Sequence, residues 1–329
     1  MRRVKEGLCR RAGNQDIYLR TSRRIAGVLR QWWRLAPGAV LAVATGVMPL
    51  GAQANPYTDS LLATVRMLAH AVPGELPSAV GYLSVVDDST PESDAVGGAP
   101  KTRTFEVTPV FQVRFRAGWV MVDAGMSHEA AGKDGTFHQD NYDKAESALR
   151  RARLIVATHE HYDHVDGVIN SPYFGDVAPR TMLTEAQLHT LLGKAGRGSG
   201  GLDSARARHF IVVDYERALP IAPGVVLVRA PGHTPGSQIV YVKLASGREL
   251  MLIGDIVWHH AGLDMQFQKP DSTSRAMGED RTMIGEEMAW LKNTVAPAGI
   301  AVVVSHDGTA LQELVHRGVV SEGLDLSAP

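Results

Sequence analysis

The feature that most constrains this chain is the run Thr-His-Glu-His-Tyr-Asp-His-Val-Asp-Gly at residues 158–167. It follows an apolar segment that predicts a short buried strand over 153–158. Alternation by two places His159 and His161 on the same side of an extended backbone, and Asp163 and His164 follow as the chain turns toward a helix. Four metal-capable side chains at one strand end indicate a metal site, and the alternative is a histidine cluster on the surface.

Three further apolar runs end in a histidine or an aspartate. His233 lies in Gly-His-Thr-Pro-Gly-Ser, Asp255 in Ile-Gly-Asp, and His306 in Ser-His-Asp-Gly. Any one of them alone would more often be a polar group satisfied by hydrogen bonds than a ligand. Because the same context recurs, we expect these strand ends to deliver their side chains to one rim of a layered α/β domain.

The remaining periodicity predicts alternating helices and strands. Helices are expected at 60–71, 141–152, 184–192, 279–295 and 308–316. Strands are expected at 105–115, 119–122, 181–183, 210–213, 225–230, 238–242, 249–253 and 300–304. Segments 87–100 and 193–201, which are rich in Gly, Ser, Pro or Asp, are predicted to be loops.

Residues 1–54 are typical of a targeting leader. Ten of the 34 basic side chains lie in residues 1–34, and an uncharged apolar stretch then ends in Ala-Gln-Ala at 52–54. This pattern predicts a secretory signal peptide cleaved after Ala54, and a periplasmic or secreted protein without a membrane segment after cleavage. An uncleaved anchor is the alternative. Residues 55–329 are expected to form a single domain.

The charge of the exported part excludes one class of partner. It contains 24 basic and 33 acidic residues, so it lacks the basic surface that binding to nucleic acid requires. The one cysteine, Cys9, lies in the leader, so neither disulfides nor thiolate ligands are available after it. A small-molecule substrate is the expected partner, and the oligomeric state stays open.

These motifs resemble the metallo-β-lactamase superfamily. The match consists of His159-x-His161-x-Asp163-His164, then His233, Asp255 and His306 in the order that the family has, within residues 100–310. The resemblance implies a four-layered αββα sandwich with a dinuclear site at one edge of its two sheets. It also implies one metal on His159, His161 and His233, a second on Asp163, His164 and His306, and Asp255 as the bridge.

Nitrogen and carboxylate ligands suit zinc, although other divalent transition metals accept them too. Two zinc ions can share a hydroxide and lower its pKa toward 7, and Asp163 is expected to orient that nucleophile as a catalytic residue. Asp123 resembles the strand-end aspartate of the family, which steadies a ligand; a simple turn-forming role is equally compatible with the sequence.

Within the family, the missing cysteine and the bridging Asp255 favour a lactonase-like hydrolase that cleaves a lactone or ester bond. A cysteine-free zinc β-lactamase and an organophosphate hydrolase are the alternatives, and a non-catalytic metal-binding protein is a third possibility of another class. His259 is a candidate catalytic donor to a developing oxyanion, where related lactonases often place a tyrosine. Trp258 and the apolar stretch 256–267 are candidates for the wall of an acyl pocket.

Overall fold

The computed structural model describes residues 55–133, 135–193 and 202–327. The predicted leader and all but the first residue of the predicted loop 193–201 lie outside these ranges. No helix in the described ranges is long and apolar enough to cross a bilayer.

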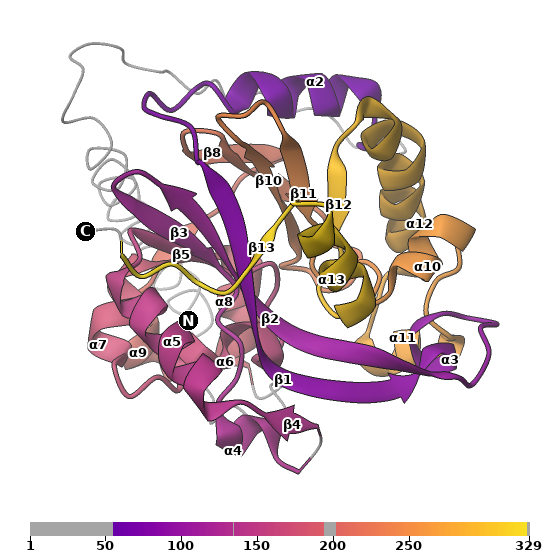
Figure 1. Cartoon of the computed structure of the whole chain (residues 1–329), viewed down its shortest axis with the longest axis horizontal. Helices are drawn as coiled ribbons and strands as arrows, with labels where there is room; N and C mark the ends of the chain where they lie inside the picture. Colours follow the sequence, from indigo (N-terminus) through magenta and orange to yellow (C-terminus); the bar gives the residue numbers. More distant parts are fainter. Residues whose placement is uncertain (1–54, 134, 194–201, 328–329) are drawn as a thin grey trace, which may run out of the picture.

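Two β-sheets form the centre of the molecule (Figure 1). The larger sheet has the order β13-β1-β2-β3-β5-β6-β7, with β4 paired to β1. Its strands are β1 (Ala79–Pro91), β2 (Arg103–Phe115), β3 (Gly118–Val122), β4 (Thr136–Phe137), β5 (Leu154–Val156), β6 (Thr181–Thr184), β7 (Ile211–Val213) and β13 (Ser321–Glu322). The smaller sheet has the order β12-β11-β10-β9-β8. Its strands are β8 (Ala218–Ala222), β9 (Val225–Arg229), β10 (Gln238–Lys243), β11 (Glu249–Leu252) and β12 (Ala301–Val303).

Helices cover the outer faces of both sheets. Those before β7 are α2 (Asp59–Leu68), α3 (Glu92–Ala95), α4 (His128–Ala131), α5 (Gln139–Arg151), α6 (Tyr162–Ile169), α7 (Phe174–Val177), η2 (Ala178–Arg180), α8 (Glu185–Leu192) and α9 (Ser204–Ala207). Those after β11 are α10 (His260–Met265), α11 (Asp271–Met277), α12 (Arg281–Trp290), the π-helical η3 (Leu291–Val295), η4 (Ala296–Ala298) and α13 (Gly308–His316).

The side chains of β9 illustrate why the domain has four layers. Val225 and Leu227 point into the apolar core between the two sheets, whereas Val226 and Val228 point into a second core under α2 and α12. A third core lies between the other face of the larger sheet and helices that include α5 and α6. Three cores separate four layers, so the predicted αββα arrangement is confirmed.

The segment 87–100, expected to be a loop, is the main correction. Asp87 to Pro91 continue β1, where they pair with residues 103–107 of β2, and α3 follows directly. These strand residues are polar because this part of the hairpin is only half-buried. Its tip is held by Gly97, whose N–H donates to the carbonyl of Gln268, so the long hairpin reaches the segment before α11 (Figure 1).

Other boundaries follow their local signals. The expected helix 308–316 is found as α13, and Thr184 caps α8 with a reciprocal contact to Gln187. The helix expected from residue 279 begins at Arg281, because the carboxylate of Asp280 accepts from the N–H groups of Thr282 and Met283. The strands β1, β4, β8 and β13 were not predicted.

Strand direction brings the motif segments together. β3 and β5 are parallel, β11 and β12 are parallel, and β9 and β11 share a direction because each is antiparallel to β10. Within each sheet, the carboxyl ends of these strands therefore open toward one edge, where the loops that carry the predicted ligands begin.

Candidate metal centre

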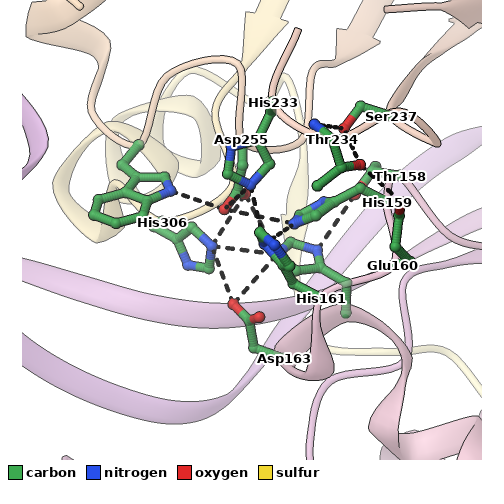
Figure 2. Close-up of polar contacts among 12 residues, drawn as sticks. Thr158, His159, Glu160, His161, Asp163, His233, Thr234, Ser237, Asp255 and His306 are labelled. Atoms are coloured by element: carbon green, nitrogen blue, oxygen red, sulfur yellow. Dashed lines mark hydrogen bonds and ion pairs between the residues drawn. The ribbon is translucent and has the colours of Figure 1, made fainter. Parts of the chain in front are cut away.

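The strand ends deliver every predicted ligand to one place. His159 and His161 lie in the loop between β5 and α6, and Asp163 and His164 lie in the first turn of α6. His233 follows β9, Asp255 follows β11 and His306 follows β12. In Figure 2 the labelled imidazoles of this set converge on Asp255, with Asp163 beside His161 and His306. All seven predicted residues are thus brought together, in two groups that share Asp255.

The first group consists of three imidazoles and one carboxylate oxygen. His161 Nδ1 lies 3.1 Å from His159 Nε2 and 3.0 Å from His233 Nε2. Asp255 Oδ2 lies 3.7 Å from His159 Nε2 and 3.6 Å from His233 Nε2. A tetrahedral zinc ion with ligand bonds of about 2.0–2.1 Å separates its ligand atoms by about 3.3 Å. The four atoms therefore fit such an ion.

The second group has two imidazoles and two carboxylates. His164 Nε2 and His306 Nε2 are 3.3 Å apart, and Asp163 Oδ2 lies 3.3 and 3.4 Å from them. Asp255 Oδ1 lies 3.3 Å from His164 Nε2 and 3.1 Å from His306 Nε2. These separations also match a tetrahedral ligand set, and they place the two oxygens of Asp255 in different groups.

Hydrogen bonds on the outer side of four rings fix which nitrogen faces inward. The Nδ1 atoms of His164, His233 and His306 lie 2.9 Å from Asp123 Oδ2, 2.7 Å from Glu279 Oε1 and 2.8 Å from the carbonyl of Val107. His159 Nδ1 lies 3.2 Å from the Thr158 hydroxyl. With Nδ1–H used outward, Nε2 presents its lone pair to the centre, as metal ligation requires.

The buried carboxylate of Asp255 also fits a cation. Its Oδ1 atom is buried and has no hydrogen-bond partner among the described residues, although two imidazoles are close. An unpaired buried oxygen is costly, and a shared cation is the usual remedy. Its Oδ2 atom accepts from Trp258 Nε1 at 2.8 Å, which orients the carboxylate between the two groups.

The two groups differ in the protonation that their surroundings favour. Burial lowers the pKa of His159 well below its ordinary value and that of His233 to about 4. Burial also opposes charge on His306, but Asp255 and Asp163 outweigh it and raise that pKa to about 9. The pKa of His164 is raised as well, since Asp163, Asp123 and Asp255 together outweigh the effect of burial and hold it well above the ordinary value.

Asp123 holds the second group from outside. It ends β3 with a φ of 62°, a left-handed conformation that aspartate tolerates, and it is buried. Its carboxylate accepts from the N–H and the hydroxyl of Thr158 and contacts His164. The two functions proposed for it from the sequence, turn formation and support of a ligand, therefore coincide in one residue.

His259 does not join the centre. Its ring is 3% exposed, with Nε2 3.0 Å from Glu106 Oε1 and Nδ1 3.4 Å from the Thr104 hydroxyl. Both nitrogens thus face the β1–β2 hairpin. Trp258, by contrast, lines the cavity over the centre, as expected.

That cavity has a volume of about 760 Å³, within the range of small-molecule sites. His161, Asp163, Asp255 and His306 form its polar floor. Apolar lining comes from Met126, Trp258, α4 and α11, with Ala130, Ala131, Ala276 and Met277 on the two helices, and the charged residues Asp88, Glu106 and Arg275 line the cavity beside them.

Sequence reasoning missed three supporting residues. Glu160 lies inside the motif and joins the two ligand loops, since it accepts from the hydroxyls of Thr234 and Thr190. A Cβ on Gly236 would lie 2.5 Å from the Glu160 carboxylate, which explains the glycine there. Glu279 and Lys269 stand in no motif, so no local signal could have identified them.

Comparison with known proteins agrees with this geometry. Residues 103–282, more than half of the chain, match the family model of the metallo-beta-lactamase superfamily. A probable metallo-hydrolase of Mycobacterium tuberculosis is 29% identical over 196 residues, which cover 46% of this chain and 57% of that protein. An N-acyl homoserine lactonase of a Bacillus species is 26% identical over 166 residues, which cover 42% of this chain and 59% of that protein. The chain spans less than two thirds of the length of these curated relatives.

Solved structures extend the likeness to the fold. A quorum-quenching N-acyl homoserine lactone lactonase has a TM-score of 0.55 at 15% identity, covering 73% of this chain and 97% of that one. A probable metal-dependent hydrolase from Staphylococcus aureus has a TM-score of 0.54 at 14% identity, covering 71% and 91%. At such identities the resemblance concerns the arrangement of sheets and helices.

Proposed function

Because the chain belongs to the metallo-β-lactamase superfamily, we propose that it is a metal-dependent hydrolase that holds two zinc ions and opens a lactone or a related ester. The observation that carries this proposal is the pair of four-atom ligand sets that share Asp255, with tetrahedral spacing in both. A solitary structural zinc would need only one closed set, so a shared carboxylate favours two ions at a catalytic site.

Bound there, the two cations would supply the Lewis acidity that ionises water and polarises a carbonyl group. The protein would supply position. Asp163 is half-buried at the cavity floor, where its carboxylate can accept a hydrogen bond from the attacking water and orient it. The proposed ligands are the seven residues of the two groups, namely His159, His161, Asp163, His164, His233, Asp255 and His306.

The substrate proposal rests on the shape and polarity of the cavity. Its floor is polar, whereas α4, α11 and Trp258 give it apolar walls. An ester or lactone with an acyl chain would place its reactive carbonyl on the floor and its chain along the walls, where burial of each CH₂ contributes about 0.8 kcal/mol. Solved lactonases with the same arrangement of elements are consistent with this substrate class.

The test is a panel on metal-loaded protein together with metal analysis. An N-acyl homoserine lactone, nitrocefin and an aryl phosphotriester separate lactone, β-lactam and phosphotriester hydrolysis. We expect two zinc equivalents and the highest kcat/KM for the lactone. Rapid nitrocefin turnover without lactone opening would replace lactone hydrolysis with β-lactam hydrolysis as the proposed activity. Failure to bind metal would refute the proposal of a metal-dependent hydrolase.

We also propose that the protein acts outside the cytoplasm, because residues 1–54 have the composition of a secretory signal. Expression of the full chain with a C-terminal tag, followed by fractionation and N-terminal sequencing, tests this. A mature protein beginning at Asn55 in the exported fraction is the expected result. Full-length protein retained in the cytoplasm would contradict it.

A further inference from the structure

A buried ion pair stands directly behind the first ligand group. Lys269, in the segment between α10 and α11, is 2% exposed, and its ammonium lies 2.6 Å from Glu279 Oε1. Both side chains of this pair are 1% exposed. Lysine is rarely buried, and a pair so fully removed from water gives weak support to stability, because desolvation offsets its attraction. Its position therefore calls for another explanation.

Glu279 contacts His233 of the first group, and Lys269 contacts Asp255, which the two groups share. Glu279 Oε1 accepts from His233 Nδ1 at 2.7 Å as well as from Lys269. The ammonium of Lys269 also donates to the backbone carbonyl of Asp255 at 2.7 Å. One ammonium thus restrains the carboxylate that orients His233 and the backbone from which Asp255 projects.

Trp258 completes this arrangement. Its ring lies 5.2 Å from the ammonium of Lys269, and its Nε1–H donates to Asp255 Oδ2. The Asp255 side chain is therefore held by Trp258 while its backbone is held by Lys269. On the second group no comparable cation exists among the described residues, since Asp123 supports His164 with the Thr158 hydroxyl as its other partner.

We propose that Lys269 and Glu279 are positioning residues that orient His233 and Asp255 for the first metal ion and thereby set its affinity relative to the second. The inference rests on the proposed two-metal site. Neither Lys269 nor Glu279 lies in a motif, so this control of the affinity for one ion follows from their packing alone. A pair with a purely structural role would affect unfolding and leave both affinities alone.

The experiment measures metal affinity rather than turnover. Full-length Glu279→Gln and Lys269→Met are titrated with Zn²⁺ against a chromophoric chelator, and with Co²⁺, whose visible spectrum reports the geometry of each site. We expect the first ion to bind about 10–100-fold more weakly in both variants; in Glu279→Gln this is the usual effect of losing an outer partner of a histidine ligand. The second ion should keep its affinity in Glu279→Gln.

Glu287→Gln is the matched control. Glu287 is a buried glutamate on α12 whose carboxyl oxygen accepts from the N–H of Gly232, so it holds the same loop without touching the imidazole. Its replacement should leave both affinities unchanged. An equal loss in this control would assign the effect to loosening of the loop and overturn the inference, as would unchanged binding in Glu279→Gln and Lys269→Met.

Each single substitution leaves a buried charge without its partner and can prevent folding. The double variant Lys269→Met/Glu279→Gln removes both charges and avoids this cost. It should fold and still bind one ion weakly; wild-type affinity at both sites would refute the inference. If the wild-type protein itself bound fewer than two ions, the proposed function would fail instead, so the two failures are distinguishable.

Discussion

The two groups of the centre, called here its first and second halves, each present four ligand atoms suited to a metal ion, but with different chemistry. The first half offers three imidazoles and one carboxylate oxygen, and burial keeps the pKa of His159 and His233 low. The second half offers two imidazoles and two carboxylates, which raise the pKa of His164 and His306. The first half therefore favours neutral imidazoles at His159 and His233, whereas the second favours charged imidazoles that its carboxylates balance.

The difference extends to the residues that hold each half. The support of the first half comes from the chain after β11, through Lys269 and Glu279, and that of the second from β3, through Asp123. The segments that flank α11 thus steady the first half and the end of β3 steadies the second, with Asp255 between them. The comparison indicates that the two halves can be weakened one at a time.

The largest effect is expected from ligands that belong to one half only. His161→Ala and Asp163→Asn should each reduce lactone hydrolysis by several orders of magnitude, because the reaction needs both ions. Metal analysis should find each variant short of a different ion. Wild-type activity in Asp163→Asn would contradict a catalytic role of Asp163, and a metal-loaded wild-type protein that hydrolyses none of the panel substrates would support a non-catalytic metal-binding protein.

A smaller loss is expected when the support of the second half is weakened. Asp123→Asn keeps a side chain that tolerates the φ of 62° but removes the charge beside His164. The second ion should bind about 10–100-fold more weakly while the first is retained, which is the converse of the result expected for Glu279→Gln. Calorimetric titration with Zn²⁺ distinguishes the two. Loss of the first ion in Asp123→Asn would contradict the assignment of separate supporting residues to the two halves.

The sequence predicted the two ligand sets and the fold better than it predicted the residues that support them. Asp163 and His164 stand in one motif, and strand-end positions led to Asp255 and His306, which the parallel strands then brought together. Hydrophobic periodicity gave a layered α/β domain, whereas the four layers were implied by the family resemblance; on β9 the run Val225 to Val228 is continuously apolar because both of its faces are buried.

The remainder depended on tertiary contacts that no short pattern encodes. Lys269 and Glu279 are unremarkable in sequence, and only packing places them against His233 and Asp255. The polar end of β1 was mistaken for a loop because its pairing with β2, rather than its composition, makes it a strand. His259 was chosen by proximity to Asp255 along the chain, but its ring turns toward Glu106.

Glu287, which holds the His233 loop without contacting the imidazole, should affect the pH dependence of stability. Burial raises the pKa of Glu287 to about 8, above the 4.5 of an ordinary glutamate. Between these values the folded protein keeps a proton that the unfolded chain loses, so stability falls as pH rises, by at most about 1.4 kcal/mol per pH unit. Urea unfolding of Glu287→Gln from pH 5 to 8 should lack this contribution. An identical pH slope in the two proteins would contradict it.

The smallest effect is expected at His259. Since both ring nitrogens face Thr104 and Glu106, His259→Gln should keep a polar contact to Glu106 and change kcat/KM for the lactone within about threefold, less than 1 kcal/mol of barrier. The thermal midpoint should fall, because a buried polar contact is weakened. A loss of about a hundredfold in kcat at unchanged KM would instead mean that the ring donates to the developing oxyanion. His259 would then act in catalysis as a hydrogen-bond donor, and the β1–β2 hairpin that holds its ring would have to be counted among the supports of the centre.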